Sequence, residues 1–190
     1  VIRAEQRYWR RPMPIGNDYL ALARQHPPLT AATVIVIVGC LAIATVLFFQ
    51  YVLLILPCPL CLEQRIAFYL AIPLAALLML GAQHGASRKV LMLGFVAIML
   101  VMLWNAGLAT YHAGVEWKWW PGPNDCSGPI NTFGNAKDIM NQLRDRVSLV
   151  RCDEASWRFL GISLAGYDVP LSLLLAAVAA WGAWSSRGRD

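Results

Sequence analysis

The sequence predicts an all-α protein, a four-helix transmembrane bundle with one large loop outside the membrane. The 190 residues are 58% hydrophobic and 14% charged, against roughly 45–50% and about 25% in soluble domains. The apolar residues also come in long unbroken runs and not in the amphipathic periods of a soluble core. A helix needs ~20 residues, at about 1.5 Å each, to cross the ~30 Å hydrocarbon layer of a bilayer. We therefore expect lipid to be the solvent and a partner of this chain.

Four apolar runs have the required length. They cover residues 29–56, 62–82, 90–111 and 169–184. The second run contains Pro73, which should kink a helix there and which neighbouring helices can tolerate. In the fourth run, Asp168 is expected to cap the helix and Pro170 to lie in its first turn.

The placement of lysine and arginine predicts the orientation. These residues lie before the first run, between the second and third, and after the fourth: Arg3, Arg7, Arg10, Arg11, Arg24, Arg88, Lys89, Arg187 and Arg189. An even number of spans puts all three groups on one side, which the positive-inside rule assigns to the cytoplasm. We expect a cytoplasmic segment over residues 1–28, a membrane domain over 29–185 and a cytoplasmic tail over 186–190.

Residues 112–167 then form a loop on the translocated side. The tryptophan-rich stretch 117–120 at its start suits the headgroup level of a bilayer. Apolar residues recur at helical spacing over 139–150, which predicts a short helix lying on the membrane surface. A small helix packed on the tops of the other helices fits this pattern equally well.

The formal charge of +5 does not indicate a nucleic-acid partner. The basic residues cluster at the ends of apolar runs and form no basic stripe with interleaved aromatic residues, the usual footprint of nucleic-acid binding. We therefore expect no nucleic-acid binding.

Two cysteines lie at the junction of the first and second runs, in the motif Cys58-Pro59-Leu60-Cys61. A Cys-x-x-Cys pair can close a small disulfide ring, and the start of a helix favours the thiolate and lowers a thiol pKa. Arg65 follows Cys61 by four residues, so the two share a helix face. A permanent cation beside the thiols favours the anion further. The pattern predicts a pair built for thiol–disulfide exchange.

Other interpretations of the cysteines remain open at this point. Cys58, Cys61, Cys126 and Cys152 could form a Cys₄ zinc site, although the second close pair usual for such sites is missing. They could also form two structural disulfides that pin the loop. Arg65 could simply extend to the lipid headgroups. Cys40 lies within the first apolar run and is expected to be an inert small hydrophobe.

The segment Cys58-Pro-Leu-Cys61-Leu-Glu-Gln-Arg65 resembles the signature of the bacterial disulfide bond formation protein B (DsbB) family. The resemblance extends over roughly residues 45–185. It includes Tyr-His-Ala-Gly-Val-Glu-Trp at 111–117, Trp-Pro-Gly-Pro before Cys126, and Trp-Arg-Phe-Leu-Gly at 157–161 after Cys152. Some members have a glutamate where this chain has Gln64, so no carboxylate role is expected there.

The resemblance implies an enzyme of the bacterial inner membrane that reoxidises a periplasmic DsbA-like thiol oxidase and reduces a membrane quinone, ubiquinone or menaquinone. Cys126 would receive the partner's thiolate, with Cys152 as its companion in the loop. Cys58 would exchange with that pair, and Cys61 would face the quinone. Arg65 and, less directly, His112 would bind the quinone, and no metal is expected.

Two other functions are considered. A relative of vitamin K epoxide reductase would also have a four-helix bundle with paired cysteines, but its active Cys-x-x-Cys is expected near the end of the bundle and not at the start of the second span. A non-enzymatic membrane subunit, pinned by disulfides or binding zinc, would show no change in its thiols when quinone is added.

Overall fold

Four long helices form the protein, and each has the length and apolar composition needed to cross a membrane. The computed structural model describes residues 26–123, 152, 153, 155 and 157–187. The helices are α3 (Pro27–Tyr51), α4 (Pro59–His84), α5 (Arg88–Glu116) and α7 (Leu164–Ser185). The shortest, α7, has 22 residues, about 33 Å at 1.5 Å per residue. The predicted all-α membrane bundle is confirmed.

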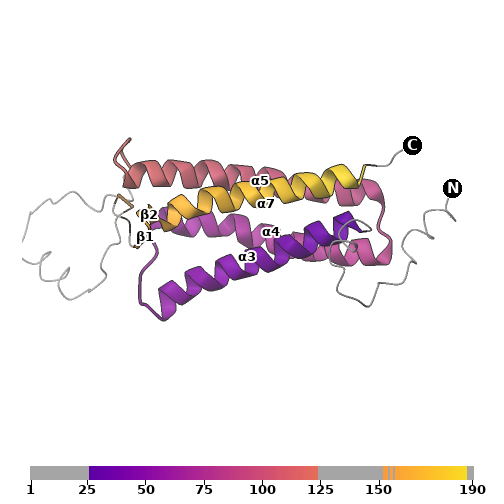
Figure 1. Cartoon of the computed structure of the whole chain (residues 1–190), viewed down its shortest axis with the longest axis horizontal. Coiled ribbons are helices and arrows are strands. Elements are labelled where there is room, and N and C mark those ends of the chain that lie inside the picture. The colour runs from indigo at the N-terminus through magenta and orange to yellow at the C-terminus, as the bar shows by residue number, and fades with distance from the viewer. Residues whose placement is uncertain (1–25, 124–151, 154, 156, 188–190) are drawn as a thin grey trace, which may run out of the picture.

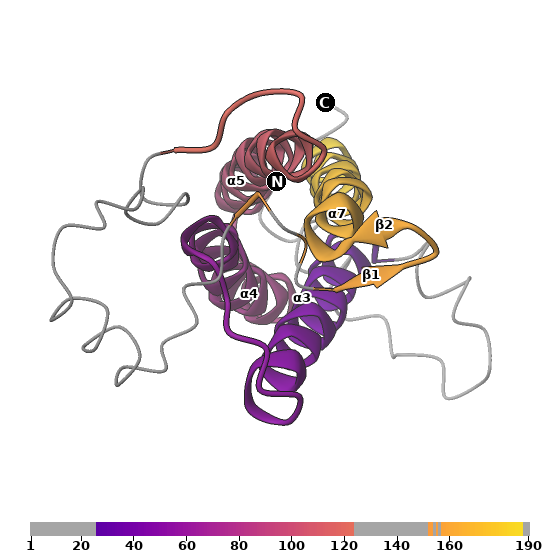
Figure 2. The ribbon, with the colours of Figure 1, turned by 90° about the vertical axis from the view of Figure 1, so that its left-hand side faces the viewer.

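The four helices run up and down in a closed ring (Figures 1 and 2). Helix α3 packs against α4, α4 against α5, α5 against α7, and α7 back against α3. Helix α3 begins, and α7 ends, at the end of the bundle where α4 is linked to α5 (Figure 1). We call this end of the bundle the opposite end. The other end, where α4 begins, is called the cysteine end.

Residues with small side chains line the contacts between the helices. The buried core includes Ala31, Ala71, Ala75, Ala179 and Ala183, which pack around larger side chains such as Phe95 and Ile35. Helices in lipid gain no hydrophobic driving force from one another, so close backbone approach through small residues becomes a main source of attraction. This packing fixes the relative positions of the helices that carry the site.

Capping residues set where the helices begin. Ser87 caps α5 by accepting a hydrogen bond from the Val90 N–H, and Ser163 caps α7 by accepting one from the Gly166 N–H at 3.1 Å. The prediction of Asp168 as the cap of the fourth helix is therefore wrong. The helix starts earlier because the Ser163 hydroxyl satisfies a free backbone donor, and Pro170 consequently lies inside α7.

The first predicted span was too long at its far end. Helix α3 ends at Tyr51, and Leu54 has a positive φ of 55°. The chain from Val52 to Cys58 then crosses to α4 outside a helix. Apolar character continues to Leu56, so composition alone gave no sign of the helix end.

A short hairpin, which the sequence did not predict, precedes α7. Strands β1 (Arg158–Phe159) and β2 (Ile162–Ser163) pair antiparallel, and Gly161 makes the turn with a φ of 83°. The Tyr167 hydroxyl donates to the Phe159 carbonyl at 3.0 Å, which fastens the hairpin to α7. The predicted surface helix over 139–150 lies outside the described residues.

Candidate functional site

The Cys-x-x-Cys pair forms the start of α4. Cys58 is the N-cap residue, and its sulfur accepts a hydrogen bond from the Cys61 N–H at 3.2 Å. Pro59 takes the first helical position, where its missing N–H costs nothing. Both thiols are free, with Cys58 buried and Cys61 half-buried. The sulfurs are thus held together by one helical turn, as thiol–disulfide exchange requires.

The protonation of Cys58 departs from the sequence-based expectation. The hydrogen bond with the Cys61 thiol, followed by burial, raises the pKa of Cys58 above its ordinary value, although the Cys61 N–H opposes this. Burial disfavours an anion more than one backbone donor favours it. Of the two thiols, Cys58 is therefore the one that holds its proton.

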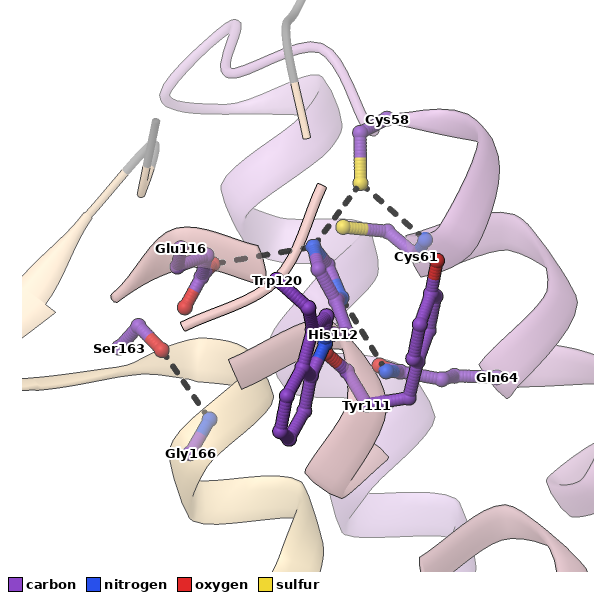
Figure 3. A network of polar contacts seen from close by, with 9 residues as sticks. All are labelled: Cys58, Cys61, Gln64, Tyr111, His112, Glu116, Trp120, Ser163 and Gly166. Atoms are coloured by element: carbon purple, nitrogen blue, oxygen red, sulfur yellow. Dashed lines mark hydrogen bonds and ion pairs between the residues drawn. The ribbon is translucent and has the colours of Figure 1, made fainter. Parts of the chain in front are cut away.

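His112 reaches the thiols from α5 (Figure 3). Its Nε2 lies 3.6 Å from the Cys58 sulfur, and its Nδ1 lies 3.2 Å from the side-chain nitrogen of Gln64. Glu116, one turn further along α5, places Oε1 3.8 Å from the same Nε2. All three polar side chains are buried. The sequence prediction included His112 but missed Gln64 and Glu116 as members of this cluster.

The loop cysteine Cys152 meets this cluster as well. Cys152 is disulfide-bonded and buried, and it packs in one apolar cluster with Cys58, Leu60 and Val115. Its predicted companion, Cys126, lies outside the described residues. A disulfided Cys152 is not free to be a zinc ligand, so the Cys₄ arrangement does not hold in this state. The structure brings a loop disulfide next to the buried cysteine with which it was predicted to exchange.

Arg65 faces a cavity of about 250 Å³ between α3, α4 and α7. Its Nη1 donates to Oε1 of Gln50 at 2.6 Å. The cavity is lined mainly by apolar side chains, together with a few polar ones: Ala42, Ile43, Thr45, Val46, Phe49, Ile55, Leu56, Pro57, Cys61, Gln64, Arg65, Phe68, Leu164, Ala165, Tyr167, Asp168 and Leu171. Cys61 and Arg65 both line this cavity, and their spacing of four residues places them on one face of α4.

His112 is not part of this lining. It contacts the thiols from the side of α5, so the structure gives no support to the predicted contact between His112 and a quinone in this cavity. Gln50, in contrast, was visible in the sequence only as a polar interruption near the end of an apolar run. Its hydrogen bond with Arg65 explains why a polar residue lies in this apolar run.

A second buried polar group connects α5 to α7. The Asn105 amide donates to Oδ2 of Asp168 at 3.0 Å and to the Ser172 hydroxyl at 2.9 Å. The Ser172 hydroxyl in turn donates to Oδ1 of Asp168 at 3.1 Å. Polar side chains within a membrane bundle pair across helices in this way. The network fixes Asp168, and with it the wall of the cavity that α7 supplies.

Comparisons with known proteins agree with this arrangement. The family model described as "Disulfide bond formation protein DsbB" matches residues 28–182. The chain is 32% identical to a "Disulfide bond formation protein B" of Xanthomonas euvesicatoria over 69% of this chain and 76% of that protein. It is 32% identical to a protein of the same name from Verminephrobacter eiseniae over 80% of this chain and 86% of that protein. No solved structure gave a significant match.

The family match covers all four helices, including the Cys58–Cys61 motif at the start of α4. Together with the multi-pass bundle and the juxtaposed cysteines, it establishes the class of the protein. The chain belongs to the DsbB family of disulfide bond formation membrane proteins.

Proposed function

We propose that this protein oxidises a soluble DsbA-like thiol oxidase of the periplasm and passes the two electrons to a membrane quinone. The observation that carries the proposal is the position of the Cys58–Cys61 pair. One side of the pair meets Cys152 of the loop disulfide, and on the other side Cys61 lines the cavity that also contains Arg65.

Each step is a disulfide exchange until the last. A thiolate of the reduced partner attacks Cys126 of the proposed Cys126–Cys152 disulfide, and the displaced Cys152 thiolate attacks Cys58. The Cys58–Cys61 bond then breaks, and Cys61 leaves as the thiolate. The partner's second thiol attacks the mixed disulfide, which releases the oxidised partner and frees the Cys126 thiolate. The Cys126 thiolate then attacks Cys152 of the Cys58–Cys152 disulfide, which reforms the Cys126–Cys152 disulfide and leaves Cys58 and Cys61 reduced. Their re-oxidation delivers two electrons and two protons to the quinone, which becomes a quinol.

The cavity suits the ring of a quinone. Its volume of about 250 Å³ is slightly below the ~300 Å³ lower bound of drug-sized ligand pockets, enough for one substituted ring without the lipid tail. The apolar lining suits the ring, and the Arg65 guanidinium supplies donors to a quinone oxygen as negative charge develops there. Gln50 holds that guanidinium in place. These residues would accept either ubiquinone or menaquinone.

The orientation forms part of the proposal. Helix α3 starts and α7 ends at the opposite end of the bundle (Figure 1), which also carries Arg88, Lys89 and Arg187. The positive-inside rule places this end in the cytoplasm of a bacterial inner membrane and the cysteines in the periplasm. Membrane-impermeant thiol reagents should then label reduced Cys126 in intact spheroplasts; labelling only after lysis would contradict the orientation.

Anaerobic mixing with a reduced DsbA-like oxidase and a soluble quinone tests the function directly. We expect quinol to form in proportion to the partner oxidised. In a separate mixing with the oxidised partner, the Cys126 thiolate of the Cys152→Ala variant should attack the partner's disulfide and trap a mixed disulfide through Cys126. A trap obtained only with Cys126→Ala would reverse the two roles. Absence of quinol with wild-type protein would instead favour a non-enzymatic subunit. The match to the DsbB family favours the proposal over a vitamin K epoxide reductase relative.

A further inference from the structure

The reduced thiols belong to a larger group of potential metal ligands. The sulfurs of Cys58 and Cys61 and one ring nitrogen of His112 all lie within 4.8 Å of one another. These three side chains come from two helices and converge on one point (Figure 3). Two thiolates and an imidazole are the ligand types that zinc and other thiophilic divalent cations prefer.

The distances fit a tetrahedral ion. With Zn–S and Zn–N bonds of about 2.3 Å and 2.0–2.1 Å, a sulfur and a nitrogen on the same ion lie roughly 3.5 Å apart. The Cys58 sulfur and His112 Nε2 are 3.6 Å apart. This pair already has the spacing of two ligands on one ion, and the Cys61 sulfur lies within 4.8 Å of both atoms.

Glu116 is a buried carboxylate beside this group of ligands. It is 8% exposed, and its Oε2 has no hydrogen-bond partner among the described residues, although the Ser163 hydroxyl and the positive charge of Arg158 stabilise the carboxylate. Its other oxygen, Oε1, lies 3.8 Å from His112 Nε2. A buried carboxylate oxygen without a partner is costly. Glu116 is not among the three ligands that already lie together, so its side chain would have to move toward His112 to become the fourth ligand of a cation.

Gln64 can orient the histidine for this purpose. Its amide group lies against Nδ1 of His112, and a half-turn of the amide places its oxygen there as the acceptor for an Nδ1–H. Nε2 would then direct its lone pair toward the thiols. Such contacts behind the ligand fix the tautomer and the ring orientation in metal sites.

We propose that Cys58, Cys61, His112 and Glu116 form a redox-gated site for a thiophilic divalent cation such as Zn²⁺. Binding to the reduced pair would replace the two thiol protons by two metal–sulfur bonds and release both protons. No electrons are transferred. The oxidised pair has no thiolate to offer, so only the reduced protein would bind the cation.

The regulatory consequence rests on the proposed function. Quinone can oxidise the pair only when both sulfurs are free to bond to each other. A bound cation would therefore hold the protein in its reduced form and stop electron flow until the cation is removed. The site would act as a reversible metal-dependent brake on disulfide formation.

Cobalt titration of the purified full-length protein tests the site without quinone or partner. Co²⁺ replaces Zn²⁺ in tetrahedral sulfur sites and has a thiolate-to-metal charge-transfer band. We expect one such band, saturating at one Co²⁺ per chain and lost on adding Zn²⁺, in reduced protein and not in oxidised protein. Binding of equal strength by the oxidised protein would overturn the proposal.

Variants assign the ligands. His112→Ala and Glu116→Gln should each weaken Co²⁺ binding about tenfold or more, and Gln64→Ala about tenfold, within the range found for contacts behind a ligand. The matched controls His84→Ala, Glu63→Gln and Cys40→Ser change exposed residues and should leave the titration unchanged. Unaltered binding in both His112→Ala and Glu116→Gln, or loss of the band in Cys152→Ser, would show that another set of ligands is used.

A final measurement separates this inference from the proposed function. Reduced protein preincubated with Zn²⁺ should form quinol at least about tenfold more slowly, and a chelator should restore the rate. Cobalt binding without any quinol formation would refute the proposed function and retain the site. Quinol formation that Zn²⁺ leaves unchanged, with no charge-transfer band, would refute the site alone.

Discussion

The two halves of the bundle differ in what they bury. Toward the cysteine end, the helices enclose polar side chains: Gln64, Asn105, His112, Glu116, Ser163 and Ser172. Toward the opposite end, the interior is apolar, with Leu78, Ala82, Leu91 and Phe95, and the buried polar residues His26 and Ser186 lie only at helix termini. The same four helices therefore build two different interiors.

The difference shows how the fold separates stability from chemistry. Small and apolar residues give close packing within the opposite end, where the buried polar residues that the structure describes lie at the helix termini. Buried polar groups in a membrane bundle are expensive and generally mark function. The cysteine end buries such polar groups despite their energetic cost, while the apolar packing of the opposite end holds the helices in register. Substitutions at the two ends should consequently affect different measurements.

The largest effect is expected from Cys61→Ser. A hydroxyl cannot take part in disulfide exchange, so quinol formation should fall to the uncatalysed background while the thermal unfolding midpoint changes little. Cys40→Ser alters an exposed cysteine of α3 and should retain full turnover. Appreciable turnover by Cys61→Ser would remove the pair from the electron path.

Arg65→Lys tests the cavity. Lysine keeps the charge but loses the planar fork that can contact Gln50 and a quinone oxygen together. One charge-assisted hydrogen bond is worth about 1.5–3 kcal/mol, so the KM for quinone should rise about tenfold or more.

The KM for the reduced partner is the internal control, and it should not change. Gln50→Leu should give a smaller rise in the quinone KM, because Arg65 remains but is no longer held. Equal kinetics for Arg65→Lys and Arg65→Met would remove Arg65 from the site and support a simple headgroup contact.

Gly182→Leu tests the opposite end. A Cβ at this position would lie 2.9 Å from carbon atoms of the Phe95 ring and 3.0 Å from the Ala31 Cβ. Overpacking of this kind costs about 1–3 kcal/mol, which should lower the unfolding midpoint. The folded protein should retain its quinone KM. Gly107→Leu is the matched control, since a Cβ at Gly107 meets nothing within 4 Å.

Ser172→Ala should have the smallest effect. It removes the hydroxyl that connects Asn105 and Asp168, and interhelical hydrogen bonds of this kind contribute on average ~0.6 kcal/mol in membrane proteins. Thr110→Ala removes a hydroxyl that donates to the Ala106 carbonyl in its own helix and should matter less. A stability loss above about 2 kcal/mol would show that the network holds α5 and α7 together more strongly than is usual.

The sequence by itself determined the membrane bundle. Lipid requires continuous apolar helices, and the length of an apolar run can be counted directly along the sequence. It also identified Cys58, Cys61 and Arg65, because their separations of three and four residues act within a single helix. The resemblance supplied Cys126 and Cys152. Helix ends were predicted less accurately, since Ser163 and not Asp168 caps α7.

Only the tertiary structure decided which distant residues meet. His112 contacts the Cys58 thiol, with Glu116 beside it, because α5 packs against α4. Gln50 contacts Arg65 because α3 also packs against α4. Cys152 lies next to Cys58. No spacing rule along the sequence predicts these contacts. They depend on how the four helices pack and on which polar groups that packing buries. A pattern along one chain carries the period of a helix but not the identity of its neighbour.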